Sequence, residues 1–281
     1  MSKLKHKTKY SINYILIIDA LLDGELQTAK TLEENLYDYF TSKAELFPRR
    51  RIKTSNINAF RKIFEGLTHM CENGTQPLIH IEAHGDKTRG LQIGEDYVAW
   101  GELIEFITPI NTLTKNNCGL ILASCFGSEI SKSLPICKPC PFNFSIAPSA
   151  EAKAGEIRDN MSRFYKDLMS SSNLNSALSQ LGSSFVFFDS SKYFLGEALR
   201  YFSTQLIGKR AKALREKIIT DVKHKLGNDN INVKLLREEA RKIIADPKDI
   251  YTHHAEIFLH GKAPLPYKDF ENLVSAAKRQ R

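Results

Sequence analysis

The chain has few cysteines and no long apolar segment. Its 281 residues contain five cysteines, an odd number that does not make a disulfide framework in a chain of this size. No apolar stretch approaches the ~18 residues that would indicate a membrane span. These absences favour a reducing, cytoplasmic home and predict no membrane span.

The N-terminus has the basic start of a signal peptide but lacks an uninterrupted apolar segment and a cleavage site. Lysines at positions 3, 5, 7 and 9 precede the apolar segment Ile12–Leu22. Asp19 interrupts that segment, and no small-residue cleavage site follows it. We therefore expect a basic arm that leads into the first strand of the core.

Spacing typical of metal ligands is also missing. Cys137-Lys-Pro-Cys140 is a lone CxxC without a second pair at zinc spacing, and we interpret both residues as ordinary loop thiols. His253-His254 has no carboxylate or cysteine at a ligand-like distance along the chain. We predict no metal site and no cofactor.

Positive charge is concentrated near the C-terminus. The formal net charge is +8, and residues 206–281 hold 17 Lys and Arg against 10 Asp and Glu. Such a tail attracts nucleic acid, acidic lipid or an acidic partner, or is simply a solvated helical face. The tail lacks a recognisable binding motif, so we rank nucleic-acid binding last among the candidate functions.

Strand-like and helix-like segments alternate through the first 205 residues, which predicts a mainly parallel sheet covered on both faces. We expect a three-layer α/β/α domain at 1–205 and a basic helical extension at 206–281. The predicted strands are Ile12–Ala20, a short one near Arg51–Thr54, Pro77–Ala83, a hairpin in Gly90–Trp100, Gly119–Ser124, Phe142–Pro148 and Phe185–Phe188. The predicted helices before the tail are Glu25–Thr41, Ser55–Cys71 (capped by Ser55 or Asn56), Glu102–Leu113, Ser128–Leu134, Gly155–Met169 and Leu174–Leu181.

Two of these strands end in a reactive side chain followed by small residues. One runs into Ala-His84-Gly85, and the other runs through Leu-Ala-Ser into Cys125. Open parallel sheets carry their chemistry at the carboxyl ends of the strands. Taken alone, His84 could be an ordinary core histidine and Cys125 an ordinary core cysteine. Because both end strands in this way, we predict that they form a Cys–His pair at one edge of the sheet.

An imidazole beside a thiol makes a nucleophile suited to acyl transfer. Histidine is the usual proton acceptor because its pKa lies near working pH. Gly85, without a Cβ, would let a substrate carbonyl approach its N–H, and the N–H of Cys125 could be the second oxyanion donor. We also expect the positive end of the helix after Cys125 to favour the thiolate.

The segment Leu78–Gly127 resembles the core of clan CD cysteine peptidases, the caspase-like group, and most closely its bacterial CHAT-domain branch. The similarity continues more loosely to about Leu181 and does not include the tail. It implies that His84 is the base, that Cys125 is the nucleophile and that Gly85 is an oxyanion donor. CHAT-type peptidases often act as effectors of bacterial stress or antiviral defence, switched on by a sensor or a partner protein.

The specificity pocket departs from the family pattern. Caspases that cleave after acidic residues carry an arginine just after the first strand, whereas here Asp19-Ala-Leu-Leu-Asp23-Gly-Glu25 has acids and no arginine. By charge complementarity we expect a basic P1 residue bound by Asp19, whose alternative role is to cap the turn. Arg49–Arg51, placed in an exposed loop, would then be a self-processing candidate.

Two further polar residues flank the pair. Glu82 shares a strand face with His84 and would either orient its imidazole or be solvated. Ser124 would either hydrogen-bond behind the site or act as a filler.

The leading hypothesis is an endopeptidase that cleaves a protein substrate through an acyl-enzyme on Cys125. A catalytically silent caspase-like scaffold that binds a partner protein is the first alternative, and a nucleic-acid-binding module is the second.

Overall fold

A computed structural model describes residues 10–44, 47–206, 208–226 and 232–279. The basic arm expected at the N-terminus lies outside these residues. The described chain forms two compact units. One comprises residues 10–135 and 139–190, and the other comprises 136–138 and 191–279. The second unit begins earlier than the boundary we expected at 205/206.

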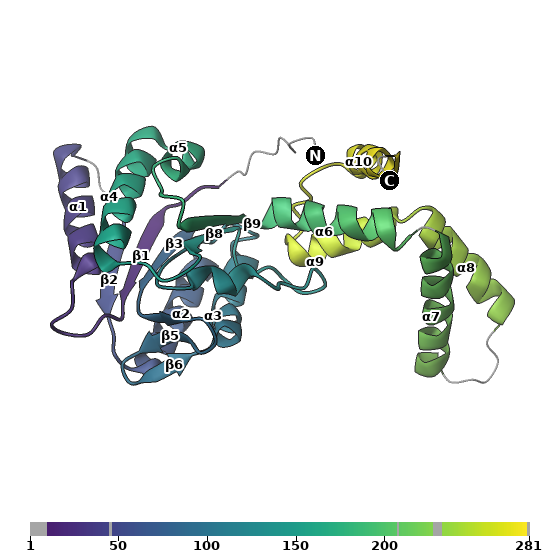
Figure 1. Ribbon diagram of the computed structural model, residues 1–281, viewed down its shortest axis with the longest axis horizontal. Helices are drawn as coiled ribbons and strands as arrows, with labels where there is room; N and C mark the ends of the chain where they lie inside the picture. Colours follow the sequence, from purple (N-terminus) through teal and green to yellow (C-terminus); the bar gives the residue numbers. More distant parts are fainter. Residues whose placement is uncertain (1–9, 45–46, 207, 227–231, 280–281) are drawn as a thin grey trace. The chain divides into compact units, whose positions relative to one another are not determined.

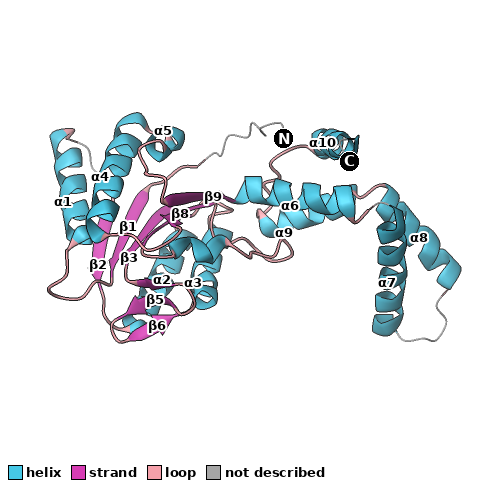
Figure 2. Ribbon diagram, viewed as in Figure 1, coloured by secondary structure: helices cyan, strands magenta, loops and turns pink. Residues whose placement is uncertain are grey.

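A six-stranded sheet forms the centre of the first unit (Figure 2). Its strand order is β2-β1-β3-β7-β8-β9, and every pairing is parallel except that of β9 with β8. The strands are β1 (Tyr14–Asp19), β2 (Arg49–Lys53), β3 (Pro77–Glu82), β7 (Gly119–Ala123), β8 (Phe144–Pro148) and β9 (Phe185–Asp189).

Helices cover both faces of this sheet (Figure 1). Helices α1 and α4 pack together on one face, and α2 and α3 pack together on the other. The strands β3, β7 and β8 are buried along their whole length, as expected of parallel strands between two helical layers. The unit is therefore a three-layer α/β/α sandwich. Its helices are α1 (Thr28–Ser42), α2 (Ile57–Glu72), α3 (Trp100–Leu113), α4 (Ala154–Ser171) and α5 (Leu174–Leu178).

Local sequence signals explain several of these elements. The Asn56 side chain accepts hydrogen bonds from the N–H groups of Asn58 and Ala59, which caps α2 as expected. The predicted hairpin forms, with a two-residue strand added before it. This small sheet comprises β4 (Gly85–Asp86), β5 (Gly90–Ile93) and β6 (Asp96–Val98).

Three expectations are corrected by the structure. Arg49–Arg51 is not an exposed loop, because it forms the edge strand β2 and pairs with β1, and this removes its accessibility for self-processing. The segment after Cys125 is a five-residue 3-10 helix, Gly127–Ser131, too short to supply the helix dipole that we expected to favour the thiolate. Helix α1 begins at Thr28, so Glu25 lies in the loop before it.

The second unit is helical and has its own aromatic core. Phe194, Tyr251, Phe258 and Phe270 are almost fully buried, and the rings of Tyr251 and Phe270 stack with centroids 4.4 Å apart. Its helices are α6 (Ser190–Thr204), α7 (Gly208–Leu226), α8 (Val233–Ala245), α9 (Lys248–Phe258) and α10 (Tyr267–Arg279). Among the residues described in either unit, no helix combines the length and apolarity that a bilayer crossing requires.

Candidate active site

Strand register brings the ends of β1, β3 and β7 to the same edge. Asp19 lies opposite Glu82, and Glu82 lies opposite Ala123. His84 and Cys125 each come two residues after this row, so both fall at equivalent places beyond the carboxyl edge. The chain order reverses between β1 and β3, and ligands of open α/β sheets bind at this switch point.

The backbone at Gly85 touches the backbone at Cys125. A Cβ added to Gly85 would lie 2.0 Å from the carbonyl oxygen of Cys125 and 3.2 Å from its amide nitrogen. Only glycine allows this approach, because backbone atoms cannot move aside as a flexible side chain would. The structure therefore brings the His-Gly pair and the cysteine together, as the sequence predicts.

The register of the small sheet orients the N–H of Gly85. Gly85 lies opposite Leu91, and the Gln92 N–H donates to the His84 carbonyl oxygen at 2.9 Å. This makes Gly85 a non-hydrogen-bonded position of an antiparallel ladder, so its N–H points away from β5. The ladder with β5 therefore does not use this amide, and an oxyanion donor must likewise be free of such a bond.

A strained turn presents the thiol. Phe126 has φ +56°, a left-handed conformation, and its N–H donates to the carbonyl oxygen of Ala150 at 3.1 Å. A Cβ on Gly127 would come within 2.9 Å of the Ala147 side chain, so the turn has no room for a side chain at position 127. Left-handed non-glycine residues are uncommon and cluster at functional sites.

His84 and Cys125 line one cavity of about 360 Å³. Cys125 is half-buried, and the His84 side chain is 52% exposed. The cavity walls are mainly apolar. They include Leu21, Leu26, Ala123, Ala152, Ala154 and Ile157.

Each reactive side chain has a hydrogen-bond partner in this cavity. The Cys125 Sγ accepts from the Ala152 N–H at 3.4 Å and lies 3.6 Å from the Ala152 carbonyl oxygen. The His84 Nε2 is 2.6 Å from Oε1 of Glu25. Within the described residues no hydrogen bond joins His84 to Cys125, and catalytic hydrogen bonds often form fully only with substrate bound.

Sequence reasoning missed Glu25 as a site residue. The apolar spacing of Leu26, Ala29, Leu32 and Leu36 made it look like the first residue of a helix. Gly24, with φ +91° in the turn before Glu25, was the available signal that this turn continues past Asp23.

Asp19, which we expected to bind a basic P1 residue, is not among the residues that line this cavity. It is fully buried, and its Oδ2 accepts from Nη1 of Arg51 at 2.9 Å. Its Oδ1 accepts from the Leu21 N–H at 3.2 Å, which is the turn-capping role of the alternative interpretation. An arginine from β2 therefore already neutralises this carboxylate.

Glu82 neither orients His84 nor is solvated. It is buried, and its two oxygens bind Nε2 of His80, at 3.0 Å, and the Thr28 hydroxyl. The Tyr165 hydroxyl lies 3.2 Å from Nδ1 of His80. Burial and the nearby Glu82 charge hold the pKa of Tyr165 well above its usual value. This network joins β3 to α1 and α4 beneath the cavity floor.

Ser124 has no hydrogen-bond partner for its buried hydroxyl among the described residues. It therefore fills space behind Cys125 and does not hydrogen-bond there.

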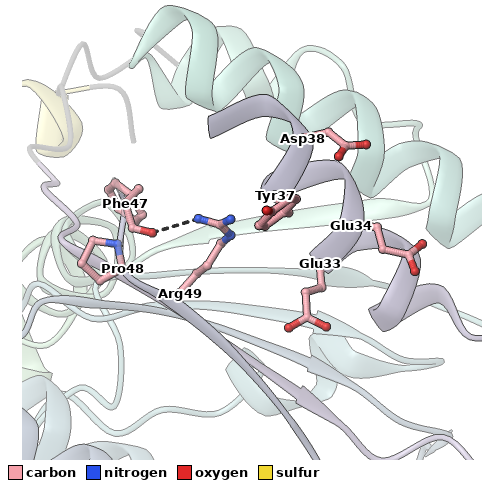
Figure 3. A pocket seen from close by; sticks show the side chains of 7 residues that line it. All are labelled: Glu33, Glu34, Tyr37, Asp38, Phe47, Pro48 and Arg49. Carbon is pink, nitrogen blue, oxygen red and sulfur yellow. Dashed lines mark hydrogen bonds between the residues drawn. The ribbon is translucent and has the colours of Figure 1, made fainter. Parts of the chain in front are cut away.

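A larger hollow lies between α1 and the start of β2 (Figure 3). Its volume is about 820 Å³, and Arg49 crosses it with its guanidinium 5.5 Å from the Tyr37 ring centroid. The Arg49 side chain donates to the Phe47 carbonyl oxygen at 3.1 Å. The residues that line this hollow include neither a thiol nor an imidazole, so its size does not make it the reactive site.

Across the described residues, no group of three or more His, Cys, Asp or Glu side chains could hold a metal ion. A scan against protein-family models finds no family that matches the chain, and a search of curated proteins finds no match.

Proposed function

We propose that the chain is a cysteine endopeptidase with His84 as its base and Cys125 as its nucleophile. The observation that carries the proposal is the backbone contact between Gly85 and Cys125, together with the cavity that His84 and Cys125 both line. This arrangement brings a thiol, an imidazole and two backbone amides to one edge of the sheet, which are the groups that acyl transfer needs.

The proposed reaction begins when His84 accepts the Cys125 thiol proton and the thiolate attacks the scissile carbonyl carbon. The N–H groups of Gly85 and Cys125 stabilise the oxyanion that forms. The intermediate collapses as the C–N bond breaks, and His84 returns the proton to the departing amine. Water, deprotonated by His84, then hydrolyses the thioester and releases the acid.

The residues that line the cavity indicate which kind of P1 side chain it would accept. With Asp19 paired to Arg51, the charge argument for a basic P1 residue no longer stands. The acids that do line the cavity, Glu25 and Glu82, are bonded to histidines. The remaining apolar walls favour an uncharged P1 side chain.

The resemblance of Leu78–Gly127 to clan CD peptidases supports a peptide bond as the target over other acyl groups. Its CHAT branch supports a role as a bacterial defence or stress effector, activated by a sensor or partner protein. The five cysteines all lie in the described part of the chain and form no disulfide there, which suits a reducing compartment such as the cytoplasm.

The test is mass spectrometry of new protein N-termini in cells that express the wild-type chain or Cys125→Ala. We expect cleavage products that share a P1 preference and that disappear in Cys125→Ala and in His84→Ala. Cys137→Ala, which removes an exposed thiol, and His69→Ala, which removes an exposed imidazole, are the matched controls. Both should cleave as wild type does.

Full cleavage by Cys125→Ala would overturn the proposal. If instead neither the wild-type chain nor any variant cleaves a protein, while the chain captures a partner protein, the result would favour the scaffold interpretation.

A further inference from the structure

A carboxylate from the loop after β1 contacts the proposed base. Oε1 of Glu25 is 2.6 Å from Nε2 of His84, across 59 positions of sequence. Oε2 of the same carboxylate accepts from the Leu22 N–H at 2.8 Å. The Gln27 side chain donates to the carbonyl oxygens of Leu22 and Glu25, each at 3.1 Å, and so braces the turn. The turn therefore holds Glu25 in one orientation toward His84.

We propose that Glu25 is a positioning residue for His84, a role that rests on the peptidase function proposed above. An ionised carboxylate only accepts hydrogen bonds, so Nε2 of His84 carries the proton that joins the two groups. In neutral His84 the lone pair is then on Nδ1, which is left to accept the thiol proton. Once that proton has moved, the Glu25 charge stabilises the imidazolium.

Glu25 is suited to remain ionised through this cycle. Partial burial raises the pKa of its carboxyl, but the hydrogen bonds from His84 and the Leu22 N–H, with the His84 charge, leave that pKa below its usual value. Since both of its oxygens have donors, Glu25 is not presented to a substrate side chain. Orientation of the base is the role that its contacts favour.

The His84–Glu25 pair differs in exposure and position from the two other histidine–carboxylate pairs of the described residues. In the described residues, His69 binds Glu72 one turn away on the exposed surface of α2. His80 binds Glu82 in full burial beneath the sheet edge. The His84–Glu25 pair is half-exposed, joins distant segments and lines the cavity that contains Cys125.

The test uses the full-length chain and iodoacetamide, a small electrophile that needs no knowledge of the substrate. Alkylation of Cys125 is followed by peptide mass spectrometry between pH 5 and 9. In wild type we expect reactivity at pH 6, where an isolated thiol with a pKa of about 8.5 is almost wholly protonated. Glu25→Gln should lower that rate by about 10-fold or more, since it removes the charge that orients the base. Glu72→Gln, the matched change beside His69, should leave it unchanged.

A second readout reports the tautomer directly. In ¹⁵N spectra, His84 should hold its proton on Nε2 in wild type and lose that preference in Glu25→Gln, with both proteins melting cooperatively. An unchanged tautomer and an unchanged Cys125 rate in Glu25→Gln would overturn the positioning role and leave the dyad standing. A wild-type Cys125 that alkylates as an ordinary thiol, and identically in His84→Ala, would overturn the dyad itself and the positioning role with it.

Discussion

The two units of this protein assemble their parts in different ways. In the sheet unit, parallel register decides which residues meet, because Asp19, Glu82 and Ala123 form one row and His84 and Cys125 follow at the same step. In the helical unit, rings such as Tyr251 and Phe270 fill a core, and α7 carries seven Lys and Arg against two acids. Strand register in the sheet unit places single side chains beside one another, whereas ring packing in the helical unit holds whole helices together. We therefore expect small changes to remove chemistry in the first unit and only large ones to matter in the second.

The largest expected effect comes from Gly85→Ala. The new Cβ would meet the Cys125 carbonyl oxygen at 2.0 Å, so the two strand ends must separate and the oxyanion donors move apart. We expect the rate of Cys125 labelling by a peptidyl electrophile to fall by about 100-fold or more. Gly66→Ala is the control, because its Cβ meets nothing within 4 Å in the middle of α2. It should stabilise the fold by about 0.5–1 kcal/mol, and an equal loss of labelling there would contradict the register argument.

Phe258→Ala tests the helical unit in the same way. Phe258 is fully buried, with its ring centroid 5.9 Å from that of Tyr193 and 6.1 Å from that of Phe194. Truncation leaves a cavity and should cost about 3–5 kcal/mol, measured by chemical unfolding. Leu235→Ala, at a side chain that is 54% exposed, should change stability by less than about 0.5 kcal/mol. A small effect at Phe258 would show that this aromatic core is not packed as described.

Tyr165→Phe tests whether the buried network beneath the cavity contributes to stability and not to the reactivity of Cys125. The change removes the hydroxyl that meets Nδ1 of buried His80, and an unpaired buried nitrogen costs about 1–3 kcal/mol. The free energy of unfolding should fall by that amount, while Cys125 labelling of the folded protein stays close to wild type. Loss of labelling without loss of stability would instead give the buried network a part in the chemistry.

Acid should weaken the small sheet slightly through Asp86. The N–H groups of Arg89 and Thr88, the Thr88 hydroxyl and the Arg89 side chain hold the pKa of Asp86 well below its usual value. A carboxyl with a depressed folded-state pKa stabilises above its unfolded pKa of about 3.9 and loses that contribution as pH falls through the folded value. Asp86→Ala should therefore lower the melting temperature most at pH 7, and the difference from wild type should shrink progressively as the pH falls below about 4. An effect of equal size across this pH range would contradict this linkage.

Local patterns predicted the elements that bring His84 and Cys125 together. The strands before His84 and Cys125 have continuous apolar runs, and the helix-length segments between strands require parallel pairing. The fold class and the meeting of the two residues follow from these features. The α2 cap at Asn56 was also readable because an N-cap acts within one turn.

The remaining contacts of the site depend on partners far apart in the chain. Asp19 meets Arg51 only because β2 pairs beside β1, and Glu82 meets the Thr28 hydroxyl only because α1 packs against this end of β3. Glu25 reaches His84 because a turn extends the loop to Thr28, where periodicity alone favoured a longer helix. Such contacts are set by tertiary packing, which no local pattern contains.

The most direct test of the central claim is covalent labelling of the full-length protein with a peptidyl acyloxymethyl ketone, followed by peptide mapping. A thiolate activated by an imidazole should form the thioether at Cys125 in wild type and in His69→Ala. In His84→Ala the Cys125 adduct should be lost. Labelling of exposed Cys137 at the rate of Cys125, or a Cys125 adduct that persists unchanged in His84→Ala, would contradict the account.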